Sequence, residues 1–421
     1  MKPRQLVFAI ATAFALLATA CGGTSGTTGE SGPLTVWLMN GSAPQSVVDG
    51  VNAEFKAKHP NVTVNVEIQQ WSDVTTKLDT AFAGSNPPDV MELGNTLVAK
   101  YAAAGALQDI TAKKGTFENS ATWLQSLTDS CTFQGKLYCV PYYAGSRAII
   151  YRKDMFDAAG VKPPTSLDEL LSVGQTLMAK NGTDKNFSAL YFPGKYWYAA
   201  APFVWDFGGD IATSSGGKWT GTLDSSQAQQ GLSTLNSLVA KLSRADKTGD
   251  ELKQDQAFAQ GHIAMIVANG WEVGVITDPK SGNPSLKDKL GAFPIPSHNP
   301  GQTAPVFLGG SDLAIAAKSK NQSLAQEWVG LLGGTKFQSQ MVTVGGVIPN
   351  TSSLTDLSTG LPAVFAAAAK NSRFTPNSPN WASVESANVL QDMLVSIFTG
   401  RATIPAATTS ASAKITQILN T

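Results

Sequence analysis

The side chains that most often carry out catalysis are few in this chain and form no catalytic pattern. Its three histidines are His59, His262 and His298, and no two of them have the spacing of metal ligands. The zinc motif H-E-x-x-H, the serine elbow G-x-S-x-G, the P-loop and a G-x-G-x-x-G turn after a strand are all absent from the sequence. The sequence therefore predicts no metal site, no cofactor, no nucleophilic triad and no nucleotide-binding loop.

Paired carboxylates are the one catalytic device that the sequence leaves open. A glycosidase needs only two carboxyl groups, and the chain has 31 acidic residues. Asp206, Asp210, Glu272 and Asp312 lie near glycines or aromatic residues and are the candidates for such a pair. A secreted glycosidase is kept as an alternative, although the missing catalytic motifs favour a protein that is not an enzyme.

Composition narrows the class of ligand. The 421 residues suggest two or three domains, and a 43% hydrophobic content can fill a large core. Basic and acidic residues number 31 each, so no overall field would attract nucleic acid or an anionic membrane. Nine tryptophans and only 15% charged residues suit a neutral ligand with apolar faces.

The elements that would position such a site alternate between strand and helix. Hydrophobic periodicity predicts a strand at 34–39, a helix at 47–55, a strand at 62–70, a helix at 74–82 and a strand at 87–93. This order is typical of a parallel sheet covered by helices, the α/β class. Further helices are predicted at 166–180, 228–242 and 323–332, and further strands at 263–267 and 313–317.

The amino terminus reads as an export signal. Lys2 and Arg4 precede an apolar run, and residues 18–21, Ala-Thr-Ala-Cys, resemble a bacterial lipobox. We therefore expect residues 1–21 to be a lipoprotein signal peptide and lipobox, with Cys21 lipidated, and residues 22–33 to be a flexible tether. Cleavage before Cys21 would leave 29 basic and 31 acidic residues, because the removed segment holds two basic residues and no acidic one.

Two further cysteines flank a predicted hairpin. Cys131 and Cys139 are equidistant from Gly135 in a Gln-Gly-Lys turn. Outside the cytoplasm such a pair would oxidise, so a cross-strand disulfide is the favoured interpretation, with two buried thiols as the alternative. The C-x-x-C spacing of a redox site is absent.

An ordered set of segments resembles the extracellular solute-binding proteins of sugar ABC importers, the family that includes maltose-binding protein. Details of the sequence are most similar to the actinobacterial lipoproteins that bind N,N′-diacetylchitobiose. The family segments are 34–37, 86–91, 135–143, 149–156, 260–266 and 346–349, and the finer matches are 92–96, 269–272 and 309–313.

The resemblance implies a periplasmic-binding-protein-like fold of two α/β lobes, with a ligand cleft between them and three hinge segments. The hinges would fall near 143–148, 307–310 and 345–349. Lobe 1 would then hold residues 34–143 and 310–345, and lobe 2 residues 144–309 and 346–421.

The resemblance also implies the binding residues. Flat aromatic rings would cover the C–H faces of a pyranose, and amide or hydroxyl groups would bond its edge. Trp71 remains undecided between site and core, and Trp37 and Trp328 are assigned to packing. The predicted ligand-binding residues are Asn40, Ser42, Asn95, Tyr196, Trp197, Trp271, Glu272, Gly310, Ser311 and Trp381.

The function expected from this resemblance is a lipid-anchored sugar receptor on the extracellular face of the cell membrane. It would capture a di- or oligosaccharide, with N,N′-diacetylchitobiose as the best candidate, and deliver it to the permease subunits of an ABC importer. We expect a monomer whose only membrane contact is the lipid. The alternatives are the same fold with another solute, such as cellobiose, maltose, trehalose, a polyamine, a metal chelate or a peptide.

Overall fold

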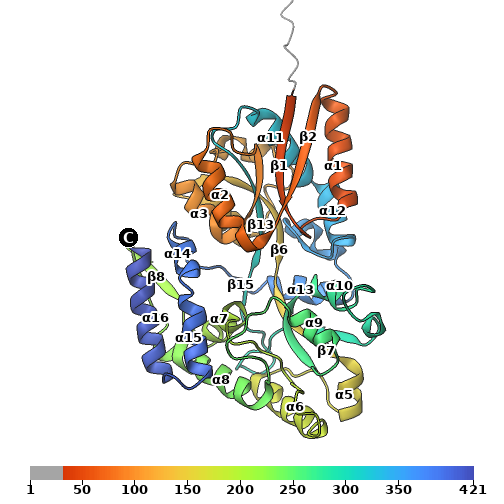
Figure 1. The fold of residues 1–421 in the computed structure, drawn as a ribbon, viewed down its shortest axis with the longest axis vertical. Coiled ribbons are helices and arrows are strands. Elements are labelled where there is room, and N and C mark those ends of the chain that lie inside the picture. Colours follow the sequence, from red (N-terminus) through yellow and green to blue (C-terminus); the bar gives the residue numbers. More distant parts are fainter. Residues whose placement is uncertain (1–31) are drawn as a thin grey trace, which may run out of the picture.

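The structure is a computed structural model that describes residues 32–421, and it consists of two α/β lobes (Figure 1). The predicted signal peptide, Cys21 and nearly all of the predicted tether lie outside the described residues. Each lobe has its own sheet and its own large hydrophobic core. Within 32–421, no helix combines the length and the apolar character that crossing a bilayer requires.

Lobe 1 is built on a six-stranded sheet in the order β14-β6-β13-β3-β1-β2. β1, β2 and β3 run parallel, as the strand–helix alternation predicts, whereas β13 runs antiparallel between β3 and β6. The strands are β1 (Gly32–Met39), β2 (Val62–Gln69), β3 (Val90–Gly94), β6 (Cys139–Gly145), β13 (Gly309–Ile315) and β14 (Ile348–Pro349).

The helices of lobe 1 bury the apolar stripes that the sequence shows. In α1, Val47, Val48, Val51 and Phe55 all face the core. The α-helices are α1 (Gln45–Lys58), α2 (Val74–Ala83), α3 (Val98–Ala103), α4 (Gln125–Cys131), α11 (Gln322–Leu332) and α12 (Thr335–Thr343), and the 3₁₀ turns are η1 (Trp71–Asp73), η2 (Asn95–Leu97), η3 (Thr111–Thr116) and η5 (Ser352–Leu357).

Lobe 2 surrounds a three-stranded antiparallel sheet, β10-β7-β11, with helices. Helix α6 begins where predicted, because the Ser166 hydroxyl accepts a hydrogen bond from the Glu169 amide. The strands are β7 (Arg147–Arg152), β8 (Ala212–Ser215), β9 (Lys218–Gly221), β10 (Met265–Asn269), β11 (Leu290–Phe293), β12 (Val306–Phe307) and β15 (Ser372–Arg373). The helices are α5 (Lys153–Ala159), α6 (Leu167–Lys180), α7 (Trp197–Asp206), α8 (Ser226–Leu242), α9 (Gln254–Ala259), α10 (Glu272–Ile276), η4 (Pro284–Leu286), α13 (Leu361–Ala369), α14 (Trp381–Ser386), α15 (Val389–Phe398) and α16 (Ile404–Leu419).

Two of the three predicted hinge segments run side by side between the lobes. β6 of lobe 1 passes into β7 of lobe 2 through a single residue, Ser146, and β12 passes into β13 through Leu308. Gly145 pairs with Gly309, so the two crossings are hydrogen-bonded neighbours. The third segment, 345–349, contains β14, which pairs with β6 in the sheet of lobe 1. Sheet pairing thus groups 348–349 with lobe 1, whereas the sequence boundary assigned them to lobe 2.

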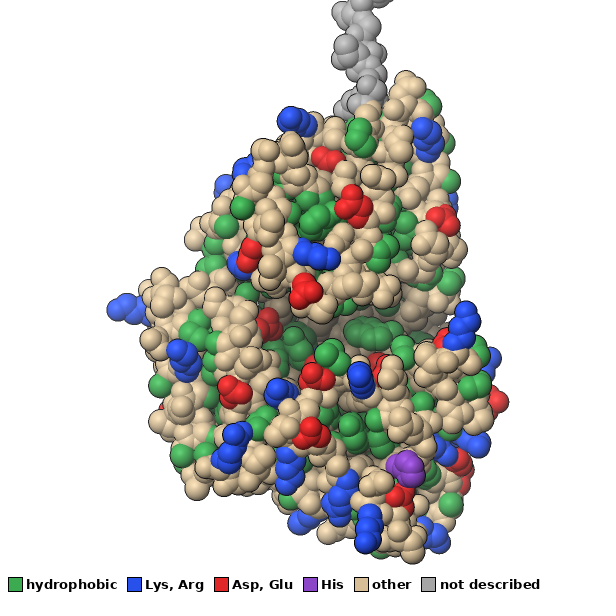
Figure 2. Space-filling model, viewed as in Figure 1, with side chains coloured by type: hydrophobic (Ala, Val, Ile, Leu, Met, Phe, Trp, Pro, Cys, Tyr) green, Lys and Arg blue, Asp and Glu red, His purple; other side chains and the backbone are tan. Residues whose placement is uncertain are grey.

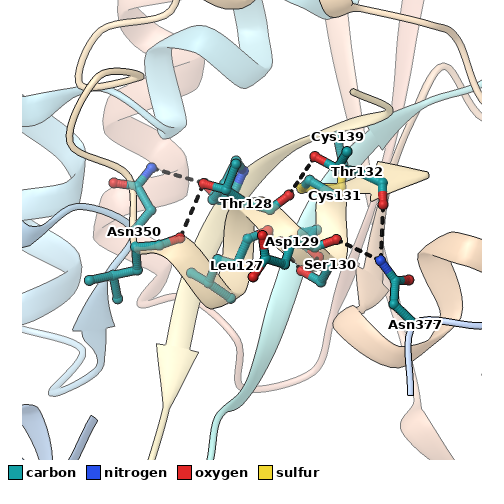
Figure 3. Close-up of a disulfide and its surroundings, with 12 residues drawn as sticks. Leu127, Thr128, Asp129, Ser130, Cys131, Thr132, Cys139, Asn350 and Asn377 are labelled. Carbon is teal, nitrogen blue, oxygen red and sulfur yellow. Dashed lines mark hydrogen bonds between the residues drawn. A yellow bond between two sulfur atoms is a disulfide. The ribbon is translucent and has the colours of Figure 1, made fainter. Parts of the chain in front are cut away.

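The cysteine pair is buried in lobe 1, where a short hairpin follows α4 (Figure 3). β4 (Thr132–Phe133) and β5 (Lys136–Leu137) are joined by Gln134 and Gly135, which both have positive φ, as a type I′ turn requires. Cys131 and Cys139 are disulfide-bonded, with their Cα atoms 5.0 Å apart. Cys131 ends a helix here rather than belonging to the hairpin strand.

A residue from much later in the chain bonds to the junction of α4 and β4. The Asn377 side-chain amide donates to the carbonyl oxygens of Asp129 and Thr132, each at 3.0 Å (Figure 3). Asn377 lies between β15 of lobe 2 and α14, so this contact ties the disulfide-bonded hairpin to the segment that returns toward the cleft.

We expect replacement of both cysteines by alanine to lower stability. The disulfide closes a loop with a sequence separation of 8, and a loop of this size corresponds to roughly 2–3 kcal/mol of chain entropy in the unfolded state. Thermal unfolding of wild type and Cys131→Ala/Cys139→Ala, each with and without a thiol reductant, measures the effect. Equal melting temperatures for the oxidised wild type and the double variant would contradict a stabilising disulfide.

Candidate functional site

A cleft of about 790 Å³ separates the two lobes. Figure 2 shows this hollow across the middle of the molecule, with hydrophobic side chains on its floor. Its volume is in the range of small-ligand sites. The lining residues used below are Asn40, Ser42, Trp71, Asn95, Thr96 and Tyr143 from lobe 1, Gly309, Gly310 and Ser311 from the β12–β13 crossing, and Arg147, Tyr198, Asn269, Trp271, Phe307 and Glu385 from lobe 2.

Polar side chains of lobe 1 enter the cleft where parallel strands end. Asn40 and Ser42 follow β1, and Asn95 and Thr96 follow β3, so that both pairs lie at the carboxyl edge of the sheet. Asn95 also spans to the β12–β13 crossing, because its side-chain amide donates to the Leu308 carbonyl at 3.0 Å. These residues give lobe 1 a rim of amides and hydroxyls.

A fully buried carboxyl group fixes this rim from below. Glu92 on β3 accepts hydrogen bonds from the Met39 amide at 2.8 Å and from the Tyr143 hydroxyl at 3.3 Å. Ser311 in turn donates to the Tyr143 oxygen at 3.3 Å. Burial raises the pKa of Glu92, with these hydrogen bonds acting in the opposite direction. Glu92 therefore joins the ends of β1, β6 and β13 under the cleft floor.

Two tryptophans line the cleft from opposite lobes. Trp71 lies in η1 of lobe 1 and is 44% exposed, and Trp271 lies at the start of α10 in lobe 2 and is 39% exposed. Among the nine tryptophans, all within the described residues, these are the two that are exposed. The Trp271 ring lies over the backbone of Gly145, where an added Cβ would be only 2.3 Å from it.

Trp271 leaves the sheet at a turn that Glu272 holds. The buried Glu272 carboxylate accepts from the Asn269 amide at 2.8 Å and from the Gln254 side chain at 2.9 Å. Burial raises the pKa of Glu272 to about 7. Glu272 does not line the cleft and acts on the site through the backbone of Asn269, so the structure gives it a positioning contact in place of the predicted ligand contact.

Three predicted aromatic residues are not in the cleft. Tyr196, Trp197 and Trp381 are buried in the core of lobe 2, and the rings of Trp197 and Trp381 contact each other edge to face. Helix α7 begins at Trp197, and its phase turns Tyr198, one position later, toward the cleft. Residues 195–198, Lys-Tyr-Trp-Tyr, thus supply a cleft aromatic residue, but at another position than predicted.

The sequence analysis did not select Arg147, Tyr198, Phe307 or Glu385, which together form the lobe 2 wall of the cleft. Arg147 and Phe307 lie inside predicted hinge segments, and a charged or aromatic residue in such a segment was the signal that could have identified them. Glu385 lies four positions after the predicted Trp381 in α14, and it lines the cleft whereas Trp381 packs in the core of lobe 2.

Glu385 bridges the lobes. The Thr96 hydroxyl of lobe 1 donates to one of its carboxylate oxygens at 3.1 Å, and the Tyr198 hydroxyl contacts the other at 3.5 Å. Burial raises the pKa of Glu385 to about 7, although the hydrogen bond from Thr96 favours the charged form. A carboxyl group of this pKa changes its charge near neutral pH.

A second groove of about 750 Å³ lies at the opposite, amino-terminal edge of the lobe 1 sheet, near Thr35 and Asp89. It belongs to one lobe. Its one tryptophan, Trp37, is already engaged, because its indole nitrogen donates to Glu67 at 2.9 Å. The interlobe cleft, with exposed rings on both sides, is the better candidate for a ligand site.

Two α/β lobes joined by adjacent crossing strands around a polar and aromatic cleft define a two-lobed ligand-binding protein. The chain belongs to the family of bacterial extracellular solute-binding proteins, whose model matches residues 40–339. The resemblance read from the sequence is thereby confirmed, and with it a binding protein rather than an enzyme.

Curated relatives cover nearly the whole chain. The diacetylchitobiose binding protein DasA of Streptomyces coelicolor is 35% identical over 419 residues, 96% of either chain. The lactose-binding protein of Rhizobium radiobacter is 24% identical over 345 residues, 77% of this chain and 74% of its own.

Solved structures confirm the predicted two-lobe fold. The GacH receptor of Streptomyces glaucescens has a TM-score of 0.81 at 23% identity, over 93% of this chain and 99% of its own. Maltose-bound MalE3 of T. maritima has a TM-score of 0.78 at 22% identity, over 92% of this chain and all of its own.

We expect the Glu385→Gln variant to gain stability relative to wild type as the pH rises from 5 to 8. The pKa of Glu385 is about 7 in the fold against its usual 4.5, so the folded state holds an extra proton between these values. Folding stability contributed by the neutral carboxyl is present at low pH and is lost as the pH rises through this window. A glutamine does not titrate, so the variant does not lose this stability. The melting temperature of Glu385→Gln minus that of wild type should therefore grow by about 2–5 °C from pH 5 to pH 8.

The matched control is Asp288→Asn, which neutralises an exposed acid of lobe 2. Its melting temperature should follow that of wild type across the same pH series. A constant difference between Glu385→Gln and wild type from pH 5 to 8 would show that Glu385 is ionised throughout.

Proposed function

We propose that this protein is the extracellular receptor of a sugar ABC importer, which captures a di- or oligosaccharide between its lobes and delivers it to the permease. The observation that carries the proposal is the pair of exposed indoles, Trp71 and Trp271, which face one cleft from opposite lobes. N,N′-diacetylchitobiose is the proposed ligand.

The chemistry of the cleft supports a sugar. A pyranose has C–H groups on its faces and hydroxyls around its edge, which suits flat rings combined with amides and hydroxyls. Trp71 and Trp271 supply the rings, and Asn40, Asn95 and Ser311 supply polar groups from two strand ends and a crossing.

The charges of the cleft argue against the alternatives. Among the described lining residues, Glu385 is the one carboxyl group and Arg147 the one cation. A polyamine would need several converging carboxylates, and a glycosidase would need two. The 35% identical relative, whose name states diacetylchitobiose binding, favours this sugar over lactose and maltose, which are named for more distant relatives.

The membrane anchor is part of the proposal. The Ala-Thr-Ala-Cys sequence at 18–21 and the glycine- and threonine-rich segment after it support lipidation of Cys21. The lipid would hold a monomeric receptor at the outer face of the cell membrane, with the tether spanning the distance to its folded part.

We expect Trp71→Ala and Trp271→Ala each to weaken binding of N,N′-diacetylchitobiose. Loss of ring stacking and of apolar burial totals at least about 2 kcal/mol, which is roughly 30-fold or more in Kd. Isothermal titration calorimetry measures the loss, and because both rings are partly exposed, the melting temperatures should stay near that of wild type.

The control for these variants is Trp219→Ala in β9, a half-buried tryptophan outside the cleft. Sugar affinity should be unchanged in it. Full affinity in both Trp71→Ala and Trp271→Ala would remove the paired indoles from the site, and with them the basis of the proposal.

We expect the Cys21→Ser protein to be released from the membrane into the medium, since the tether alone has no membrane affinity. Fractionation of cells that express wild type or Cys21→Ser measures this, and sugar binding by the released protein is the control for folding. Retention of Cys21→Ser in the membrane fraction to the same extent as wild type would overturn the anchor.

A further inference from the structure

Arg147 is held rigidly at the bottom of the cleft. It is the first residue of β7, directly after the β6–β7 crossing, and only 7% of it is exposed. Its Nε donates to the Tyr196 hydroxyl at 3.0 Å, and its guanidinium carbon lies 4.7 Å from the ring centre of Tyr198 and 5.4 Å from that of Phe307. These contacts fix the plane of the guanidinium group.

The terminal nitrogens of this guanidinium are left without acceptors. Within 32–421, neither Nη1 nor Nη2 of Arg147 has a hydrogen-bond partner, and Nη1 is fully buried. A buried cationic donor without an acceptor is costly, so this corner of the cleft is suited to a ligand that brings an acceptor oxygen. Tyr196, buried and absent from the cleft lining, is the residue that orients Arg147.

Glu385 lies beside Arg147 on the same wall. The Tyr198 ring connects them, because its face lies under the guanidinium while its hydroxyl contacts the Glu385 carboxylate at 3.5 Å. Phe307 packs on Tyr198 with ring centres 4.9 Å apart and completes an apolar surface next to the two charged groups. The wall therefore has a donor in Arg147, an acceptor in Glu385 and an apolar face in Phe307. All three contact the Tyr198 side chain.

We propose that Arg147, Glu385 and Phe307 form a subsite for the acetamido group of an N-acetylated sugar. The inference rests on the proposed function as a sugar receptor and names the group that the cleft selects. The carbonyl oxygen of the acetamido group accepts from Nη2 of Arg147, the terminal nitrogen that is not fully buried, its N–H donates to Glu385, and its methyl group packs against Phe307. A hydroxyl at the same sugar carbon has no methyl group to pack against Phe307. It also extends less far from the sugar ring than an acetamido group.

The surroundings of Arg147 favour this neutral group over a carboxylate. Glu251, Glu272 and Glu385 all come from elements that pack around it, and its charge interacts with those of Glu251 and Glu272. A uronic acid would add a negative charge beside Glu385, next to a cation whose charge already interacts with Glu251 and Glu272 behind the cleft wall. An amide adds no charge, and it can bond both to the Arg147 donor and to the Glu385 acceptor.

Calorimetric titration of two sugars into three variants tests the subsite. N,N′-diacetylchitobiose carries the acetamido groups, and cellobiose has hydroxyls at the same positions. Wild type should bind the acetylated sugar at least 10-fold more tightly, and Arg147→Gln should weaken that sugar by roughly 10- to 100-fold while changing cellobiose affinity far less. Arg147→Lys, which keeps the charge without the planar fork, should retain part of the preference.

The matched control is Arg401→Gln, the same substitution at an exposed arginine between α15 and α16, and both affinities should be unchanged in it. Equal weakening of the two sugars by Arg147→Gln, or a wild type that binds cellobiose as tightly as the acetylated sugar, would overturn the subsite and leave the sugar receptor standing. A wild type that binds neither sugar, nor any of a broad oligosaccharide panel, would overturn the proposed function itself. The wild-type preference needs no variant, so the test does not depend on Arg147→Gln folding.

Discussion

Close contact between two backbone crossings is the constraint on which the rest of the structure depends. At Gly145 and Gly309 the strands that link the lobes are paired, and at Gly310 an added Cβ would be 2.2 Å from the Tyr143 carbonyl. Gly310 has a φ of +139°, a conformation that side-chain-bearing residues rarely adopt. The glycines let the crossings lie against each other and let the Trp271 ring lie over Gly145. The cleft therefore has the two crossings at its floor and aromatic rings on its walls.

Buried carboxyl groups turn that crossing region into a defined site. Glu92 holds the end of β1 and the Tyr143 hydroxyl, and Glu272 holds the turn that presents Trp271. Both are bonded to backbone amides, and burial raises the pKa of both. Both fix loops at strand ends, so Glu272, one of the four carboxyl groups singled out from the sequence, has a structural contact. Glu385 differs, since it lies on the cleft wall and touches both lobes.

Much of the fold could be predicted from the sequence because it depends on local periodicity. The alternating residues of β2, the apolar stripe of α1 and the Ser166 cap of α6 all lie where the sequence places them. The antiparallel insertion of β13 between β3 and β6 could not be predicted from periodicity, because a buried strand has the same apolar pattern in either direction.

Candidate site residues could be predicted where they directly follow the end of a strand. They could not be predicted where the rotation of a helix determines which side chains face the cleft. Asn40, Asn95 and Trp271 each come directly after a strand or its turn, and all three line the cleft. Tyr196 and Trp381 lie at helix starts and pack in the core, whereas the cleft residues of the same helices are Tyr198, two positions later, and Glu385, four positions later. Arg147 could have been noticed as a charged residue in a predicted hinge segment, but its role needed the three-dimensional structure, since only the packed rings of Tyr198 and Phe307 show that its guanidinium is held at the cleft.

The central claim is that one sugar binds between the two exposed indoles, and titration of intrinsic tryptophan fluorescence tests it most directly. Trp71 and Trp271 are the exposed tryptophans of the described chain, so a ligand placed between them must change their emission. The account predicts a saturable change with N,N′-diacetylchitobiose that fits one site per chain. Emission that stays constant with this sugar, and with cellobiose, maltose and trehalose up to millimolar concentrations, would contradict it.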